Sequence, residues 1–128
     1  MPLPTAAQPC CSVMTVDRAR ARPFWEGVLG LAVIGEDNHA IVYDVGGGMP
    51  LRLTSHPGHV PAQHTVLGWN VPDIRAALAE LVAAGVHCNV YDGFGQDDDG
   101  VWSTPGGEAQ VAWFNDPDGN VLSLTQLG

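Results

Sequence analysis

One stretch of this sequence rich in possible oxygen ligands is Asn115-Asp116-Pro117-Asp118-Gly119-Asn120. A calcium loop of the EF-hand type needs regularly spaced oxygen ligands and a final bidentate glutamate, and this stretch has neither. Pro117 instead presets the φ angle of a turn, and Gly119 accepts a positive φ. Apolar residues flank the stretch on both sides, so we predict a hairpin here rather than a metal site.

His64 and Cys10 are the residues whose types suit catalysis. His64 begins a strand-like segment, where it is either a ligand or general base beside a pocket, or an ordinary polar residue. Cys10 is a nucleophile only if a neighbouring group lowers its thiol pKa, and the sequence identifies no such base. We expect a buried or pocket-lining thiol. The histidines and cysteines show no HxH, HExxH or CxxC spacing, which gives no sign of a zinc site.

The composition limits the classes of partner. The 128 residues carry a net charge of −9 and include no lysine. A phosphate backbone would be repelled, so we expect no nucleic-acid partner, whereas a cationic or neutral small molecule suits this field. No apolar run reaches membrane length, and the N-terminus lacks the features of a signal peptide. We therefore expect a soluble cytoplasmic protein that does not contact a membrane.

The same order of elements occurs twice along the chain. The first part predicts a strand at 10–16, a helix capped by Asp17 and ended by Gly30, and strands at 31–35, 39–45 and 50–54. Pro23 is unfavourable inside a helix, so this helix could instead begin there. The second part predicts a strand at 64–71, a helix capped by Asp73 and ended by Gly85, a strand at 86–91, a loop at 92–107 and the final hairpin.

This repeat predicts an internal duplication of a βαβββ unit. We expect an N-terminal arm (1–9) followed by one domain (10–128), composed of module one (10–54), a linker (55–62) and module two (63–128). One module alone would bury little core, so the two should join. The predicted fold class is α+β, with a curved, mostly antiparallel eight-stranded sheet, helices on its outer face and a concave face free for a ligand.

Two motifs within this order carry a family resemblance. They are Phe24-Trp25-Glu26-Gly27-Val28-Leu29-Gly30 in the first module and Phe114-Asn115-Asp116-Pro117-Asp118-Gly119-Asn120 in the second. The chain resembles, over residues 10–126, the vicinal oxygen chelate superfamily, which includes glyoxalase I, bleomycin-resistance proteins, fosfomycin-resistance proteins and extradiol dioxygenases. The final motif is typical of the superfamily but identifies no reaction.

The resemblance also implies where a metal would bind. In metal-dependent members, four strands each bring a His, Gln or Glu to a divalent ion, and the corresponding positions here are Cys10, Arg52, Val66 and Ser123. Arg52 would place a positive charge against the ion, Val66 has no lone pair, and neutral Ser123 replaces glutamate poorly. We therefore expect no metal and no cofactor.

Alternation along the strands predicts which side chains face the ligand. Trp113 should face the pocket and Phe114 the helices, so Trp113 is either a stacking residue or sheet core. Arg52 lies either on the pocket face, paired with a carboxylate or an anionic ligand, or on a solvent-exposed edge. Tyr91, Phe94 and Trp102 belong to or flank a loop with the composition of a mobile lid. The complete set of predicted ligand-binding residues is Cys10, Ser12, Met14, Tyr43, Arg52, His64, Val66, Phe94, Trp102, Trp113 and Ser123.

Our leading hypothesis is a homodimeric, non-catalytic protein that sequesters a small organic molecule, such as an aromatic or cationic antibiotic, as bleomycin-resistance relatives do. The first alternative is a metal-free lyase or isomerase with His64 as base. The second is a lyase or dioxygenase that retains an unconventional ion.

Overall fold

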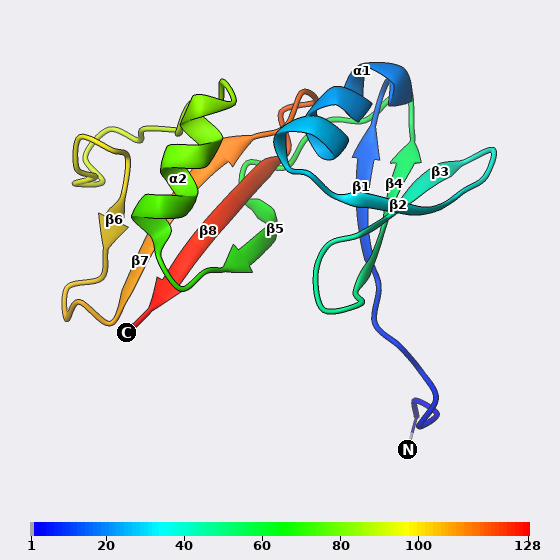
Figure 1. Cartoon of the computed structure of the whole chain (residues 1–128), viewed down its shortest axis with the longest axis horizontal. Helices are drawn as coiled ribbons and strands as arrows, with labels where there is room; N and C mark the ends of the chain where they lie inside the picture. Colours follow the sequence, from blue (N-terminus) through cyan, green and yellow to red (C-terminus); the bar gives the residue numbers. More distant parts are fainter. Residues whose placement is uncertain (1) are drawn as a thin grey trace. The chain divides into compact units, whose positions relative to one another are not determined.

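The computed structural model describes residues 2–128, which form two compact units (Figure 1). The boundary between the units falls between His59 and Val60, inside the segment predicted as a linker. Of the predicted N-terminal arm, Met1 lies outside the described residues, and residues 2–9 contain no helix or strand. The helices and strands of the first unit are β1 (Cys11–Thr15), α1 (Arg18–Arg22), η1 (Pro23–Val28), β2 (Ala32–Glu36), β3 (Ala40–Asp44) and β4 (Pro50–Ser55). Those of the second unit are β5 (Thr65–Asn70), α2 (Ile74–Ala83), β6 (Trp102–Ser103), β7 (Ala109–Asn115) and β8 (Val121–Leu127).

Each unit contains one four-stranded mixed sheet. The strand orders are β1-β4-β3-β2 and β5-β8-β7-β6. In each sheet the first pair is parallel and the other two pairs are antiparallel. The α+β class and the two βαβββ modules are therefore confirmed. The described residues form two four-stranded sheets, and a single curved sheet of eight strands is not confirmed.

The first helix begins where the aspartate predicted it. The Asp17 carboxylate accepts a hydrogen bond from the backbone N–H of Arg20 at 3.2 Å, which caps the first turn. The alternative start at Pro23 is wrong. Pro23 instead lies where the α-helix passes into the π-helix η1, in which the N–H of Leu29 bonds to the carbonyl of Phe24. The π-helical hydrogen bonding, from each N–H to the carbonyl five residues earlier, lets the helix continue past Pro23.

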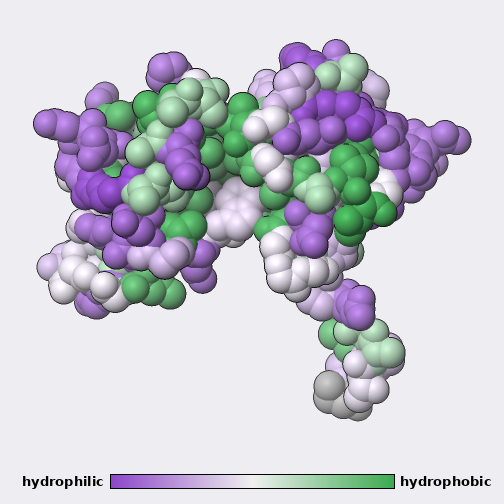
Figure 2. Space-filling model, in the orientation of Figure 1, coloured by the Kyte–Doolittle hydropathy of each residue, from purple (hydrophilic) through white to green (hydrophobic). Residues whose placement is uncertain are grey.

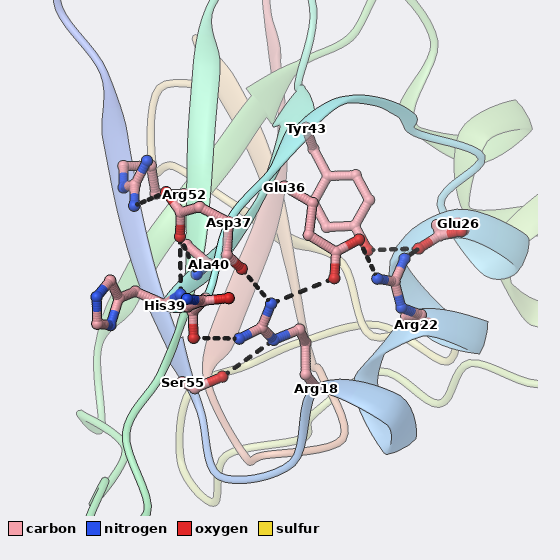
Figure 3. Close-up of polar contacts among 11 residues, drawn as sticks. Arg18, Arg22, Glu26, Glu36, Asp37, His39, Ala40, Tyr43, Arg52 and Ser55 are labelled. Atoms are coloured by element: carbon pink, nitrogen blue, oxygen red, sulfur yellow. Dashed lines mark hydrogen bonds and ion pairs between the residues drawn. The ribbon is translucent and has the colours of Figure 1, made fainter.

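An ionic network ties the first helix to the neighbouring hairpin (Figure 3). Arg18 contacts Glu36 at 3.2 Å, and Arg22 bonds to both Glu26 and Glu36. The Tyr43 hydroxyl donates to Glu26 at 2.8 Å. All four charged side chains remain partly exposed, so each pair adds little stability, and the main effect of the network is to orient the helix.

The second helix covers one face of its sheet (Figure 1). Its N-cap is Asp73, which accepts from the N–H of Ala76 at 3.1 Å, and it ends before Gly85, whose φ is +97°. Both positions agree with the sequence prediction. Ile74 and Leu78 are buried, and the Ile74 N–H donates to the Gln126 side chain of β8. No helix among residues 2–128 has the length and apolar character needed to cross a bilayer.

The strand predicted at 86–91 is wrong. This segment makes one isolated bridge, between Cys88 and Phe114, and the second strand of the unit along the chain is β6 instead. The reason is a side chain in the following loop: the amide of Gln96 bonds to the backbone of Asn89 and Tyr91. The Asn89 carbonyl and the Tyr91 N–H are therefore hydrogen-bonded to a side chain, whereas in a regular strand they would bond to the backbone of a neighbouring strand.

The polar stretch between β7 and β8 is a turn, as predicted. Asp116 accepts hydrogen bonds from the N–H groups of Asp118 (2.9 Å) and Asn120 (2.8 Å) and from the Asn120 side-chain amide (2.8 Å). Gly119 has a φ of +82°. Burial raises the pKa of the Asp116 carboxyl, although its hydrogen bonds act in the opposite direction.

Candidate functional site

Four aromatic side chains gather on one side of the second unit. They are Trp113 on β7, Trp102 on β6, and Tyr91 and Phe94 on the connecting loop. Trp113 is the centre of the group: its ring centroid lies 5.4 Å from Phe94, 5.7 Å from Tyr91 and 6.4 Å from Trp102. Phe94 and Tyr91 meet it edge to face, at interplanar angles of 82° and 78°. We call these four residues the aromatic cluster.

The strand register places this cluster on the face away from α2. Trp113 pairs with Ser123, and Ser123 pairs with Gly68, so these three residues share one face. Phe114 and Leu122 pair on the other face and are fully buried. The facing of Trp113 and Phe114 therefore follows the alternation predicted from the sequence. Whether Trp113 binds a ligand stays a prediction.

A pocket opens beside the aromatic cluster. Its volume is about 440 Å³, and its lining is Gln63, His64, Thr65, Tyr91, Phe94, Trp113 and Val121. A second hollow of about 640 Å³ shares Gln63, Tyr91 and Val121 with it. Polar groups border this extension, where the Asn89 amide donates to Asn115 at 2.7 Å. Together the two hollows offer aromatic surface and a few hydrogen-bonding groups, which is the usual composition of a small-molecule site.

A third hollow lies on the helix side of the same unit. It has a volume of about 480 Å³ between α2 and the loop at Asp98–Gly100, and its lining includes Leu78, Val82 and Cys88. It is larger than the pocket at Trp113 but has no aromatic side chain in its lining. Burial raises the pKa of the Cys88 thiol, which makes it a poor nucleophile. We therefore take the aromatic pocket as the candidate site.

His64 lies at the rim of the aromatic pocket. Its Nδ1 lies 3.0 Å from the carbonyl oxygen of Thr65. A carbonyl only accepts, so Nδ1 carries the proton in this bond and the neutral ring keeps its lone pair on Nε2. The structure thus brings His64 and Trp113 to one pocket, as strand alternation predicted, and leaves both roles of the histidine open.

The second unit carries most of the negative charge. Residues 60–128 contain nine Asp and Glu residues against one arginine, a formal charge of −8 out of the −9 of the whole chain. That arginine, Arg75, is engaged: it contacts Asp97 at 2.7 Å and Asp99 at 2.9 Å. The acidic run at Asp97–Asp99 is therefore partly an ion-pair site rather than only a solvated charge run. No arginine lines the aromatic pocket.

The position that the family resemblance equates with glutamate is a buried serine. Ser123 is only 6% exposed, and a Cβ placed on neighbouring Gly68 would lie 2.6 Å from its Oγ. Val66, the other such position in this unit, is 37% exposed and offers no donor atom. Neither side chain suits a divalent ion.

The predicted site residues of the first unit have different surroundings. Cys10 precedes β1 and is exposed, so it is not the buried thiol of the first alternative, and a pocket-lining role stays a prediction. Ser12 pairs with Arg52, and Met14 lies two residues further on the same face. Arg52 contacts the carboxylate of Asp37 at 3.0 Å. A protein carboxylate is one of the partners that the sequence predicts for this arginine. The backbone N–H of His39, and next the Arg52 guanidinium, lower the pKa of Asp37 to about 2.

Tyr43 lies on the opposite face of this sheet. Its register partner is Leu51, whereas Arg52 pairs with Val42, and Tyr43 is fully buried. Its ring stacks on Trp25 with centroids 6.1 Å apart. The structure therefore places it in the core beneath the helix, and we leave it out of the candidate site.

The residues at the four family positions do not fit a metal. In the first unit they are an exposed thiol and an arginine already paired with a carboxylate, and in the second a valine and a buried serine hydroxyl. Within the described part of the chain, 2–128, no three His, Cys, Asp or Glu side chains come together in a metal-binding group. We derive no chemical step through a metal.

Sequence reasoning missed several residues of the pocket. Gln63 and Thr65 flank His64, and Val121 enters from the start of β8. Strand alternation could have identified Val121, because it pairs with Asn115, two residues after Trp113. No pattern identified Gln63, since it lies in an irregular segment whose path depends on the rest of the fold.

Comparison with known proteins agrees with this architecture. The family model described as Glyoxalase/Bleomycin resistance protein/Dioxygenase superfamily matches residues 8–124. No curated protein sequence matches significantly. Similar solved structures include a bleomycin resistance determinant encoded on the transposon Tn5 (20% identity, TM-score 0.72, covering 95% of this chain and 98% of the relative).

Two further solved structures show the same fold at low identity. One is TnmS3, an antibiotic binding protein from Streptomyces sp. CB03234 (23% identity, TM-score 0.69, covering 97% of this chain and 99% of the relative). The other is a lactoylglutathione lyase from Agrobacterium tumefaciens (15% identity, TM-score 0.70, covering 96% and 95%). The fold thus occurs both in proteins named for antibiotic binding and in an enzyme, and function must be argued from the site.

Proposed function

Because this chain belongs to the glyoxalase/bleomycin resistance protein/dioxygenase superfamily, we propose that it is a metal-independent member that binds and sequesters a small aromatic or cationic organic molecule, such as an antibiotic. The observation that carries this proposal is the aromatic cluster around Trp113, which borders a pocket of about 440 Å³. Sequestration needs contact area and orientation rather than proton transfer, and this pocket supplies both.

The aromatic cluster supports a flat ligand with a positive charge. Each good aromatic contact adds roughly 0.5–1.5 kcal/mol beyond simple burial, and a cation over a tryptophan ring adds about as much. The formal charge of −8 on residues 60–128 attracts cations towards the pocket. The exposed parts of Tyr91 and Phe94 offer surface that a planar molecule can cover.

Solved structures with the same fold also support antibiotic binding. A bleomycin resistance determinant and an antibiotic binding protein share this fold. The lactoylglutathione lyase shares it too, which is why an enzymatic alternative is kept.

Binding of a matched set of dyes tests the proposal. Proflavine is planar and cationic, acridone is planar and neutral, and 8-anilinonaphthalene-1-sulfonate is anionic. We expect saturable quenching of tryptophan fluorescence by proflavine, weaker quenching by acridone and least by the sulfonate. Failure of all three to bind would contradict the proposal.

A pair of variants locates the binding. Trp113→Leu removes the central ring of the aromatic cluster, and Trp69→Leu makes the same change at a residue that pairs with Leu124 on the other face of the sheet. Calorimetric titration should show proflavine binding weakened about tenfold or more in Trp113→Leu, as expected for lost stacking and cation–π contact, and nearly unchanged in Trp69→Leu. Equal effects of the two changes would place the dye elsewhere.

The second candidate function is a metal-free lyase or isomerase that uses His64 as a general base. The observation that favours it is the position of His64 in the same pocket as Trp113, with Nε2 unprotonated in the neutral ring. Turnover that disappears in His64→Ala while dye binding persists would favour this reading over sequestration. A stoichiometric transition metal in the purified protein would instead favour a retained metal-dependent activity.

We also propose that the protein acts as a homodimer in the cytoplasm. β2 is an edge strand of its sheet, and Ile34 on it is 57% exposed. An apolar surface patch lies over the β2–β3 hairpin (Figure 2). An exposed apolar edge favours pairing with a second copy. Sedimentation should give the mass of a dimer, and Ile34→Lys should shift it to the monomer. A wild-type monomer would refute this part of the proposal.

A further inference from the structure

The side chain of Gln96 makes three hydrogen bonds to the backbone of the loop that carries Tyr91 and Phe94. We propose that Gln96 is the positioning residue of the aromatic pocket: its amide fixes the backbone on both sides of Phe94 and so keeps Tyr91 and Phe94 against Trp113 before any ligand arrives. This inference rests on the proposed function for its consequence in binding, but the preformed geometry that it asserts is a property of the free protein.

The hydrogen bonds of Gln96 join three separate points of the loop. Its Oε1 accepts from the backbone N–H of Tyr91 at 2.7 Å. Its Nε2 donates to the carbonyl of Asn89 at 2.8 Å and to the carbonyl of Gly100 at 2.7 Å. The two ends of the segment 89–100 are thereby tied to its middle. Gln96 is only partly exposed, so water competes weakly for these bonds.

Only a primary amide of this length supplies the pattern. The site needs one acceptor and two donors on a single side chain, which glutamine provides. Glutamate has the same length but would turn a carboxylate oxygen towards the carbonyls of Asn89 and Gly100. The Gly100 carbonyl is held in place, because Gly100 is buried and its N–H donates to the carbonyl of Asp97 at 2.9 Å.

The tied loop places the two rings directly. Tyr91 is itself the residue whose N–H is bound, and the Phe94 N–H donates to the Tyr91 carbonyl at 3.1 Å in the same turn. The rings of Tyr91 and Phe94 then lie 5.9 Å apart, and both meet Trp113 edge to face. The composition of this loop predicted a mobile lid, and its hydrogen bonds indicate an ordered wall instead.

A second anchor lies on the outer side of the loop and offers a control. Arg75 of α2 contacts Asp97 and Asp99, and its side chain is 43% exposed. Exposed ion pairs contribute little, since solvent and salt screen them. If hydrogen bonding by Gln96 fixes the loop, loss of the Arg75 pairs should leave the aromatic cluster in place.

The experiment compares Gln96→Glu, Gln96→Ala and Arg75→Ala in the full chain. The first readout uses no ligand: the four tryptophan indole N–H signals in a ¹⁵N correlation spectrum, where ring currents report on neighbouring aromatic rings. The second is calorimetric titration with proflavine. Thermal unfolding of each variant shows that it folds, and Gln96→Glu retains the bulk of the side chain, so a role in packing alone would be preserved.

We expect the indole signals of Trp102 and Trp113 to move in both Gln96 variants, while those of Trp25 and Trp69 stay and Arg75→Ala resembles the wild type. Proflavine should bind the Gln96 variants about tenfold more weakly, because two side chains must then be ordered on binding. If the signals of Trp102 and Trp113 stay, or move as far in Arg75→Ala, the inference is overturned. If they move as expected but wild-type protein binds no dye, the inference stands and the proposed function fails.

Discussion

Replacing Asp116 by asparagine should destabilise the turn between β7 and β8 through the loss of one hydrogen bond. The Asp116 carboxylate accepts three hydrogen bonds, and Oδ2 receives the one from the Asn120 amide at 2.8 Å. In Asp116→Asn an NH₂ group would face that NH₂ donor, while the two backbone donors keep an acceptor at Oδ1. Opposed donors in a buried site cost about 1–3 kcal/mol. Because burial also raises the pKa of Asp116, removing its charge recovers part of this cost.

We therefore expect a loss of about 1–2 kcal/mol in the free energy of unfolding at pH 7. Urea denaturation measures it, and Asp98→Asn is the matched control, since it removes the same charge from an exposed loop residue of the same unit. The raised pKa means that the folded protein binds this proton more tightly than the unfolded chain. Wild-type stability should thus fall as pH rises from 3.8 through the raised pKa, a slope that Asp116→Asn lacks. Equal stability of the two variants would refute this account of the turn.

Other predictions concern single contacts. Carbon-detected titration should give Asp37 a pKa of about 2, and the stability that this carboxylate contributes should be lost as pH falls from 3.8 towards that value. Arg52→Ala should raise the pKa only partly, because the His39 N–H remains; an ordinary value in the wild type would contradict this. Gly68→Ala should destabilise by about 1–3 kcal/mol, since its Cβ would lie 2.6 Å from Ser123 Oγ. Thermal unfolding of Gly68→Ala/Ser123→Ala should show part of that loss restored, and simple additivity would argue against the contact.

The parts of the fold predicted correctly depend on local chemistry. Asp17 and Asp73 cap the helices, Gly85 ends the second one with a positive φ, and Asp116 organises the final turn. Each of these preferences is set by the residue and its immediate neighbours, so a single sequence reveals it. The two-module architecture followed from seeing the same local signals twice.

The errors arise where contacts outside a residue's own segment decide the structure. The segment at 86–91 has the composition of a strand, but Gln96 occupies its hydrogen-bonding groups from the loop that follows. The sequence predicts Tyr43 in the pocket, but its pairing with Leu51 places it in the core. Trp113 was assigned to its face correctly, because a fixed turn beside it sets the register of β7 against β8.

The aromatic cluster combines both kinds of information. Alternation places Trp113 on the face away from α2, but only the folded loop brings Tyr91 and Phe94 within 5.4–5.7 Å of it. The chemistry of a candidate site can thus be suspected from a single strand residue, whereas the assembly of its walls requires the tertiary structure.

The central claim is that the aromatic cluster binds a small planar molecule. The most direct test is titration of ¹⁵N-labelled protein with proflavine, followed through the four indole N–H signals and the backbone amide signals. We expect saturable shifts of the Trp102 and Trp113 signals and unchanged signals for Trp25 and Trp69. Shifts confined to the groove between α2 and residues 98–100, or no saturable shift of Trp113, would contradict it.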